Sequence, residues 1–519
     1  MKLNNMIIAG ICCLSLVANS SCSDFLEENP KTDFSEKNYF TSVNQAQRAV
    51  DGSYERLRAL QNYDGYGEGP WVTLDLLCGH ATTLGQSTYN NLYIRHQAAT
   101  NNPSFKAVWE GFYEGIASCN LCIEGISEMD ASEDVKKELL GESRALRALY
   151  YFYLTRLYGD IPLILEPVTA TSESLYPERS AQASVFTAIV EDLKYAETSG
   201  LPETSTSGRV SIGFVKTLLA DVYLYMAGAP LNKGKEYYEL SYKKAKEVLD
   251  KSYCVAPNSP SYSAGQANSA WYSLFDDYEK LHDDENKNRG ELIFQIQYKE
   301  GINDNQIAFM TIPTNKRVTK YNDEFGSLMP TWEFYNSYEA GDKRTREKEF
   351  FFTRDGHKDD KSNIIEFGQP ALYKYYDKEG AEETTRSDLN FTIYRLPEVM
   401  FIYAEAYTEA VGAPDQMSYD LVNAIRERAE LAPISGLGKD DFIQALRKER
   451  AHELCFENKD YFDIQRTRLA YNVVANRFEA YNSFANKNGV TFSEKYLLWP
   501  IPSTETDSNP KLLPNNPGW

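Results

Sequence analysis

One segment, 142–158 (ESRALRALYYFYLTRLY), limits what this chain can fold into more than any other. Large apolar side chains lie nearly all round the helix that it would form, and such a helix is buried. Gly159 and Pro162 follow it and predict a helix end and then an extended segment. The segment therefore predicts a buried helix, which needs packing partners on all sides.

Helical patterns recur along the chain. The stretch 42–45 (SVNQ) is a capping-box signature before an apolar stripe. Small residues such as Ala145, Ala220 and Ala404 lie between aromatic ones, and they let facing helices approach closely, as in tetratricopeptide-type repeats. The predicted fold is mainly α, with divergent tetratricopeptide-like helical repeats, long irregular loops and a few short β-strands. Further helices are expected at 181–197, 213–227, 236–250, 395–411, 417–430 and 441–457, and the clearest strand at 292–298.

The N-terminus has the features of an export signal. Residues 6–18 form an uncharged apolar run, which is too short to span a bilayer and typical of a signal-peptide core. Two serines then lead into Cys22, as at the end of a bacterial lipoprotein signal. We expect removal of 1–21 and acylation of Cys22, so that acyl chains hold the protein on a membrane that it does not cross. The alternative is ordinary secretory cleavage that leaves Cys22 a free thiol.

Charge and cysteine usage exclude several classes of function. The formal net charge is −21, and such a chain is repelled by phosphate backbones, which argues against nucleic acid as a partner. No later segment is apolar and long enough to predict a second membrane span. Cys119 and Cys122 form a lone C-x-x-C in a helical pattern, and the other cysteines have no regular spacing. Neither a disulfide framework nor a cofactor is predicted.

A dense set of charged residues lies near the C-terminus. Opposite charges fall three or four residues apart, which favours a structural ion-pair network between stacked helices over a catalytic site. His452 lacks the second histidine of a zinc-protease motif, and 284–290 lacks the glycine position and final carboxylate of a calcium loop. No metal site is predicted. The charged set is Arg426, Arg428, Arg447, Glu449, Arg450, Glu453, Glu457 and Arg466.

The start CSDFLEENP and six later motifs resemble the SusD/RagB family of surface nutrient-binding lipoproteins. The resemblance covers nearly the whole mature chain. The departures are Asn19, where an aliphatic residue is usual, and 458–460 (NKD), where the family usually has a Gly-(His/Lys)-Arg turn. The six motifs are ESRALRALYYFYLTRLYGDIPLI, GELIFQIQY, YRLPEVMFIYAEAYTEA, LVNAIRERA, ALRKERAHELCFENKDYFDIQR and LLWPIPSTETDSNPKLLPNNPGW.

The resemblance implies a non-enzymatic lipoprotein of the outer membrane, facing the cell exterior, that binds glycans and delivers them to a TonB-dependent SusC-type transporter. It implies a SusD-like fold in which an N-terminal part with the helical repeats, 22–250, and a C-terminal part, 251–519, pack as one structural unit. The acidic residues after Cys22 resemble the signal that routes such lipoproteins to the outer leaflet. We expect the helical-repeat side, 142–250, to face the transporter.

Ligand-binding residues are expected in loops, because a rigid scaffold positions them there. The segments 71–103 and 261–278 mix aromatic and amide side chains. An aromatic face covers the C–H groups of a sugar, while amides and carboxylates bind its hydroxyls. Trp332 and Trp499 lie beside scaffold motifs and are predicted to pack. The predicted site residues are Trp271 first, then Tyr272, Trp71, Tyr89, Tyr93, Asp75, Asn90 and His80; failing these, the insertions 321–325 and 377–390 are the next candidates.

Two other functions remain open. A peptide-binding site, as in the RagB branch, would depend on backbone hydrogen bonds and cavity shape more than on stacked aromatics. The tryptophans in the two loops favour glycan. A helical glycoside hydrolase needs two carboxylates that converge across the scissile bond, roughly 5–9.5 Å apart, and Asp75, Asp276 and Asp277 are the residues that would supply them.

Overall fold

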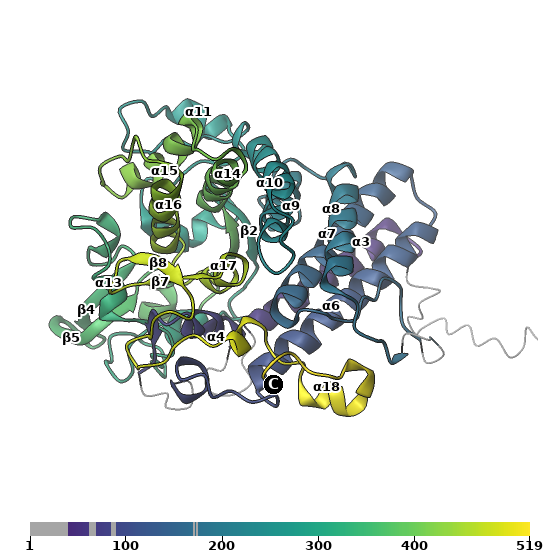
Figure 1. The fold of residues 1–519 in the computed structure, drawn as a ribbon, viewed down its shortest axis with the longest axis horizontal. Helices are drawn as coiled ribbons and strands as arrows, with labels where there is room; N and C mark the ends of the chain where they lie inside the picture. Colours follow the sequence, from purple (N-terminus) through teal and green to yellow (C-terminus); the bar gives the residue numbers. More distant parts are fainter. Residues whose placement is uncertain (1–39, 62–68, 85–89, 170–171, 173–174) are drawn as a thin grey trace, which may run out of the picture.

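Long helices form a row that mostly follows the order of the chain. α6 packs on α7, α7 on α8, α8 on α9 and α9 on α10, and α10 packs on α14, which comes much later in the sequence. The computed structural model describes residues 40–61, 69–84, 90–169, 172 and 175–519, and the row runs from the right of Figure 1 to its centre. The helices are α6 (Pro103–Glu128), α7 (Glu133–Tyr158), α8 (Gln182–Glu197), α9 (Ile212–Ala227), α10 (Lys235–Leu249) and α14 (Leu396–Val411).

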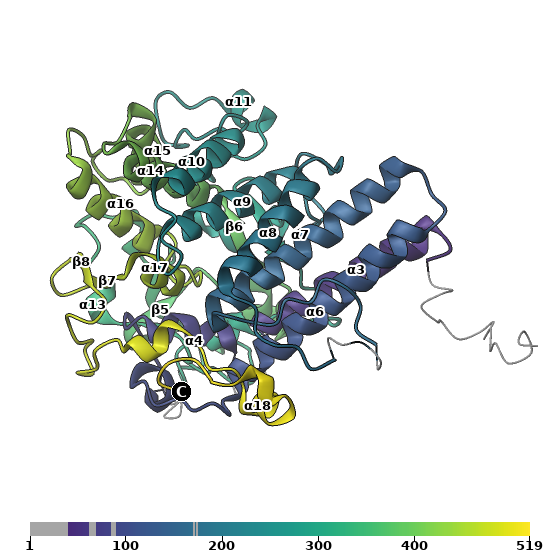
Figure 2. The same cartoon turned by 45° about the vertical axis from the view of Figure 1, so that its right-hand side comes forward.

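The row continues at both ends. α14 contacts α15 and α16, which also contact each other, and α3 lies against α6 and α7 at the opposite end. Figure 2 shows α3 and α6 side by side, away from α15 and α16. None of the described helices has the length and apolar character of a membrane span. The mainly helical fold that the sequence predicts is confirmed. The bounds are α3 (Val43–Tyr54), α4 (Pro70–Leu77), α15 (Gln416–Arg428), α16 (Lys439–Glu453) and α17 (Asp460–Thr467).

Strands form antiparallel pairs, four of them within the described ranges. The pairs β4–β5 and β7–β8 are hairpins, whereas β1–β3 and β2–β6 join segments that are distant in sequence. The strands are β1 (Ala81–Thr82), β2 (Leu292–Ile296), β3 (Met329–Pro330), β4 (Phe351–His357), β5 (Asp360–Leu372), β6 (Phe391–Arg395), β7 (Leu469–Asn472) and β8 (Arg477–Ala480). Short helices are η2 (Glu55–Leu60), η3 (Asn90–Ile94), α11 (Ala264–Ser269), η5 (Tyr278–His282), η6 (Asp284–Asn286), α12 (Ile307–Met310), α13 (Trp332–Tyr335), η7 (Lys343–Thr345), η8 (Gly380–Thr384), η9 (Glu494–Leu497), α18 (Ser503–Ser508) and η10 (Pro510–Leu512).

Local sequence signals explain where several elements begin and end. Ser42 caps α3, since its hydroxyl oxygen accepts a hydrogen bond from the Gln45 backbone N–H at 3.3 Å. Gly159 ends α7 with a φ of +72°, a conformation that glycine adopts without strain. The strand predicted at 292–298 is present as β2, but both of its faces are buried. Gln295 tolerates burial there because its side chain bonds the Asn288 backbone N–H and the Thr392 hydroxyl.

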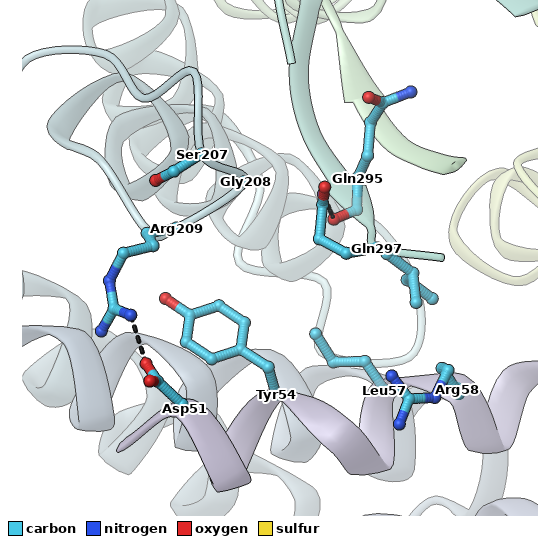
Figure 3. A pocket seen from close by; sticks show the side chains of 10 residues that line it. Asp51, Tyr54, Leu57, Arg58, Ser207, Gly208, Arg209, Gln295 and Gln297 are labelled. Carbon is cyan, nitrogen blue, oxygen red and sulfur yellow. Dashed lines mark hydrogen bonds and ion pairs between the residues drawn. The ribbon is translucent and has the colours of Figure 1, made fainter. Parts of the chain in front are cut away.

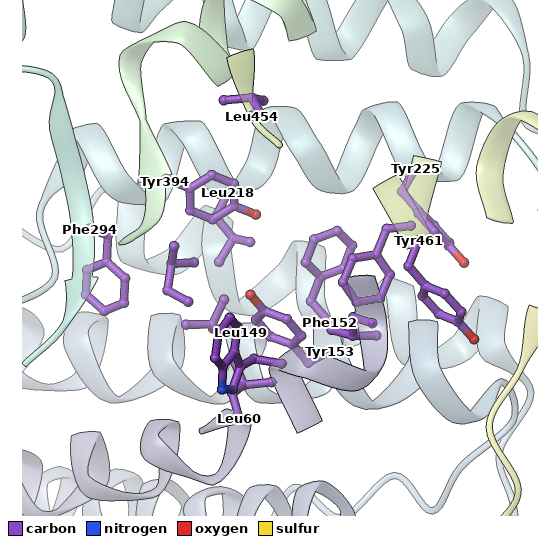
Figure 4. Packing of buried hydrophobic residues seen from close by; sticks show 14 of the residues in the cluster. Leu60, Leu149, Phe152, Tyr153, Leu218, Tyr225, Phe294, Tyr394, Leu454 and Tyr461 are labelled. Carbon is purple, nitrogen blue, oxygen red and sulfur yellow. The ribbon is translucent and has the colours of Figure 1, made fainter. Parts of the chain in front are cut away.

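The middle of α7 lies in the main core, as its sequence predicts. Every residue from 145 to 158 is buried. Figure 4 shows Leu149 and Phe152 of α7 beside residues of α9 and β6, among them Leu218 and Tyr394. Arg147 is tolerated on this buried helix because its Nε donates to Asp192 of α8 at 2.8 Å. The α7 segment therefore organises the core from which the helical row is built.

A buried network of arginines and glutamates joins the C-terminal helices to the strands. Glu453 of α16 contacts Arg395, at the end of β6, at 2.7 Å, and Arg428, at the end of α15, at 2.6 Å. Arg344 also contacts Glu453, at 3.2 Å. Glu291, just before β2, pairs with both Arg395 and Arg428. Burial alone would raise the pKa of Glu453, but Arg428, Arg395 and Arg344 together lower it, so the carboxylate stays charged.

The structural role predicted for the charged set is confirmed. Arg447 and Arg466 both bind Glu405 of α14, and Arg450 binds Glu398 of the same helix. Glu405 and Glu398 lie on α14 and do not belong to the predicted charged set. These ion pairs therefore form between different helices more than within one helix. A one-turn spacing therefore predicts the role of these residues but not their partners.

Replacing Glu453 should destabilise the protein strongly. Glu453→Gln removes a carboxylate that three buried arginines share, and breaking buried ion pairs in this way costs on the order of 3–5 kcal/mol. The exposed pair Arg346–Glu430, at 2.6 Å, provides the control, since Glu430→Gln should change the free energy of unfolding by at most about 1 kcal/mol. Urea titration of both variants measures the difference. Equal effects would show that the buried network does not stabilise the fold.

Candidate functional site

Trp332 is a large aromatic side chain at the surface, with 41% of its area exposed. It begins the short helix α13, which Thr331 caps by accepting from the Phe334 backbone N–H. The indole Nε1 donates to the Gly368 carbonyl of β5 at 3.1 Å, and the ring meets Tyr335 edge-on at 5.5 Å. The indole is therefore held in place while part of its surface faces solvent. Trp332 thus packs on one side, as predicted, and leaves part of its surface exposed, which the sequence does not predict.

Strand pairing brings the first predicted ligand loop next to Trp332. In the β1–β3 pair, Ala81 lies opposite Pro330 and Thr82 opposite Met329. The Thr331 backbone N–H also donates to the His80 carbonyl at 3.0 Å. Residues 80–82 thus lie beside the segment that leads directly into Trp332, although the two are about 250 residues apart in the chain.

A second, smaller hydrophobic cluster lies around β3 and the β4–β5 hairpin. Met329, Phe352 and Phe367 belong to it, and Leu84 packs against it. Gly326 lets the segments that contain Thr314 and Leu84 approach its backbone closely, because a Cβ there would lie 2.9 Å from the Thr314 hydroxyl and 3.0 Å from Leu84 Cβ. This cluster supports the surface that carries Trp332.

Five of the predicted ligand-binding residues lie in the interior instead of on exposed loops. Because a sugar stacks on an exposed ring face, burial gives these side chains a packing role in this structure, and ligand contact by them stays a prediction. They are Trp71, which is fully buried in α4, and Asp75, His80, Tyr93 and Tyr272, each at most 5% exposed.

Specific contacts account for their burial. Trp71 packs against Tyr375 and Phe391, with ring centroids 6.0 and 6.4 Å apart. Asp75 accepts from the Asn458 amide at 2.8 Å. The φ of Asn458 is +60°, a conformation that asparagine tolerates better than most residues, which explains why it stands where a glycine is usual.

The remaining predicted residues have different positions. Trp271 is half-buried, and its indole Nε1 donates to Glu203 at 2.9 Å. Asn90 begins η3, whereas Tyr89 and Cys22 lie outside the described residues. Trp499 is fully buried, so its predicted packing role is confirmed. The signal for Trp332 in the sequence was its place in PTWEF, where a proline and a capping threonine start a helix of a single turn.

Two cavities lie away from Trp332. The smaller has a volume of about 160 Å³, and Figure 3 shows Tyr54 of α3 and Gln297 beside it, with the Asp51–Arg209 ion pair at its edge. The larger, of about 580 Å³, lies between η5–η6 and the segment 373–383. Neither cavity includes Trp332 among its lining residues.

The carboxylates considered for hydrolysis do not share one environment. Asp75 is 1% exposed beside Asn458, whereas Asp277 lines the larger cavity and Asp276 forms an exposed pair with Lys280. Burial raises the pKa of Asp75, and repulsion from Asp460 adds to this. Glycoside hydrolysis needs both carboxyl groups at the same bond, and the burial of Asp75 keeps its carboxyl group away from a substrate at the surface.

Comparison with known proteins decides the family. A model described as the SusD family matches residues 347–519, and one described as starch-binding and associating with the outer membrane matches residues 24–224. The crystal structure of a SusD superfamily protein from Parabacteroides distasonis has a TM-score of 0.85 and 33% sequence identity, covering 92% of this chain and 100% of that one. The chain belongs to the SusD family.

Other relatives agree with this SusD-like fold. SusD-like protein P2 from Formosa agariphila is 27% identical over 96% of this chain and 97% of its own length. A laminarin-binding SusD-like protein has a TM-score of 0.70 and 21% identity, covering 92% of this chain and 100% of that one. The second likeness supports the fold alone. The predicted family and fold class are confirmed.

Removing the carboxyl of Asp460 should give a pH-dependent gain in stability. Burial and repulsion from Asp463 raise the pKa of Asp460 to about 7. A carboxyl group whose pKa is higher in the folded protein than in the unfolded chain stabilises the folded state fully below the unfolded pKa of about 4. This stabilisation is lost as the pH rises through the folded-state pKa of about 7. Asp460→Asn should therefore stabilise the protein increasingly between pH 4 and pH 7, by on the order of 2 kcal/mol, because the 17% exposed side chain keeps some hydration.

Thermal melting across this pH range measures the effect. The exposed Asp130 provides a matched control, and Asp130→Asn should shift the melting temperature little at any pH. A difference between Asp460→Asn and the unsubstituted protein that stays constant from pH 4 to pH 7 would contradict the raised pKa.

Proposed function

We propose that this SusD-like protein binds oligo- or polysaccharides at the cell surface, without cleaving them, and delivers them to a TonB-dependent SusC-type transporter. Membership of the SusD family along almost the whole chain is the observation that carries the proposal. The starch-binding description of the model that matches the N-terminal part and the laminarin-binding neighbour support glycan as the ligand.

The surface around Trp332 is the proposed glycan site. An exposed indole that is already fixed by Gly368 and Tyr335 offers a flat apolar face at low entropic cost. Tyr89 and Asn90 follow β1 in the adjoining loop by sequence, so they stay candidates for further contacts. Trp271 remains a second candidate, because it is half-buried and keeps a hydrogen bond to Glu203.

Two alternatives have less support. A hydrolase would need a convergent carboxylate pair, and Asp75 is shielded from any substrate by burial. A peptide-binding site would depend on backbone hydrogen bonding, whereas an exposed tryptophan suits a sugar ring better. Binding without catalysis is therefore the function that the site supports best.

The membrane anchor and transporter contacts are part of the proposal. Removal of 1–21 and acylation of Cys22 would place the protein on the outer membrane, facing the exterior, which agrees with the outer-membrane association in the description of the N-terminal model. The helical-repeat side, 142–250, would face the transporter, since stacked helices present extended surfaces. The parts 22–250 and 251–519 would act as one unit, and residues of both, such as Leu149 and Ile402, belong to the main core.

Trp332→Ala should abolish most glycan affinity while the protein stays folded. Aromatic anchors of this kind contribute at least about 2 kcal/mol, which corresponds to a loss of affinity of about 30-fold. Isothermal titration with neutral glycans, laminarin and starch oligosaccharides first, measures this loss. Trp499→Ala should instead lower the melting temperature, because that indole is fully buried. Unchanged affinity of a folded Trp332→Ala variant would reject this site, and no glycan binding by the unsubstituted protein at millimolar concentration would reject the function.

Cys22→Ser should release the protein from the membrane. Without the thiol the acyl chains have no attachment point, so we expect the full-length variant to lose metabolic labelling by palmitate and to leave the membrane fraction. Substitution of Ser20 by Ala, which keeps a small residue before the cysteine, is the control. Continued labelling of Cys22→Ser would show that the anchor lies elsewhere.

A further inference from the structure

The smaller cavity, which we call the Arg58 pocket, lies between three segments that are distant in sequence. Its walls come from residues 51–58, 207–209 and 295–297, as Figure 3 shows. Its volume is about 160 Å³, and protein cavities of about 150 Å³ can hold a molecule such as benzene. The pocket therefore has room for a ligand built on one six-membered ring.

Most polar side chains that line the pocket already have partners. The Gln297 amide uses both of its N–H groups and its oxygen in hydrogen bonds within the protein. Arg209 pairs with Asp51 and, at 2.7 Å, with Glu142. A ligand would have to displace these bonds in order to use either side chain.

Arg58 differs from these side chains because most of its donors are unused. A guanidinium has five N–H donors, and in the described part of the chain one of them, on Nη2, has a partner, the Glu55 carboxylate at 3.1 Å. Glu55 is shared, since it also contacts Arg56 at 3.1 Å, and its side chain is 48% exposed. The Arg58 side chain itself is only 18% exposed. The pocket thus contains a sheltered positive charge with unused donors.

An aromatic ring lies between the two arginines of the pocket. Tyr54 is half-buried, and its hydroxyl donates to Glu142 and accepts from the Val210 backbone N–H at 2.9 Å. These two bonds hold the ring in place, and Figure 3 shows it between Arg209 and Arg58. A fixed ring offers flat apolar surface to a ligand at low entropic cost.

The charge and shape of Arg58 favour a carboxylate as its partner. A guanidinium is planar and binds a carboxylate through two parallel N–H···O bonds. A cation would be repelled by Arg58 and would find Asp51 already paired with Arg209. A polyanion would be opposed by the net charge of −21, whereas a carboxylate brings a single charge. These conditions select a small ligand with one carboxylate.

We propose that the Arg58 pocket binds a small organic acid, with its carboxylate on Arg58 and its ring against Tyr54. The site is separate from Trp332, which does not line the pocket, and it does not depend on the proposed binding of neutral glycans. A sugar acid and an aromatic acid both have this chemistry.

Isothermal titration of the mature chain at pH 7 and low salt tests the proposal. The probes are galacturonate and benzoate, each with an uncharged counterpart, galactose and benzamide. We expect at least one acid to bind, with an affinity that falls as salt rises, and the tighter of the two identifies the source of the ligand. That acid should bind at least about tenfold more tightly than its counterpart, because hydrogen bonds to a charged group contribute at least about 1.5 kcal/mol.

Two substitutions of Arg58 separate its charge from its shape. Arg58→Gln should weaken acid binding at least about tenfold, and it should change the melting temperature little, because the pair with Glu55 is exposed. Arg58→Lys keeps the charge but loses the planar fork, so its affinity should be intermediate. The control, Arg48→Gln, removes the same charge from an exposed position of α3 and should bind like the unsubstituted protein.

Replacing Glu55 should have the opposite effect. Glu55→Gln removes a negative charge that competes for Arg58, so we expect acid binding to become severalfold tighter. A gain of affinity cannot be explained by partial unfolding of the variant.

Four outcomes would overturn the proposal: no binding of either acid at millimolar concentration, equal affinity for an acid and its uncharged counterpart, equal effects of Arg58→Gln and Arg48→Gln, or weaker acid binding by Glu55→Gln. Trp332→Ala should leave acid binding unchanged, and Arg58→Gln should leave the binding of neutral glycans unchanged. The failure of this proposal is therefore distinguishable from the failure of the proposed function.

Discussion

The pairing of buried arginines with glutamates around Glu453 is the interaction on which the C-terminal half of this structure depends. Removing these charges from water costs several kcal/mol for each ion, and only good geometry with several partners repays this. Arg395 shows how that condition is met, since its guanidinium contacts Glu291, Glu453 and Glu457 at once. Because these partners lie before β2, on α16 and after α16, the network fixes elements that are distant in sequence relative to one another.

That fixed arrangement positions the surface that carries Trp332. Arg344 links the network to the segment that follows α13, and Tyr338 of that segment stacks on His452 of α16 at 3.9 Å. α13 itself meets the β4–β5 hairpin through the hydrogen bond from Trp332 to Gly368. The exposed indole is thus attached to a rigid interior on two sides, and rigidity of this kind lowers the entropy that a bound ligand must overcome.

Sequence reasoning predicted the scaffold well because the scaffold has periodic signals. The all-round apolar pattern of 142–158 gave a buried helix, and the helices predicted from spacing agree with α8, α9, α10, α14 and α15 within two residues at each end. The site was harder, because a loop aromatic that binds a sugar and one that packs have the same composition. Trp71 and Trp332 each follow a proline within two residues, yet one is buried and the other exposed. Trp71 is buried against Tyr375 and Phe391, about 300 residues away in the chain, and contacts at such a distance have no local signal.

The charge distribution differs between the interior and the surface. Arg344, Arg395 and Arg428 are buried with carboxylates that compensate them, so the interior network contributes little to the net charge of −21. The excess of negative charge must therefore lie mainly on the surface, where it keeps polyanions away. A neutral glycan experiences little of this field, and an indole such as Trp332 recognises it by shape and dispersion.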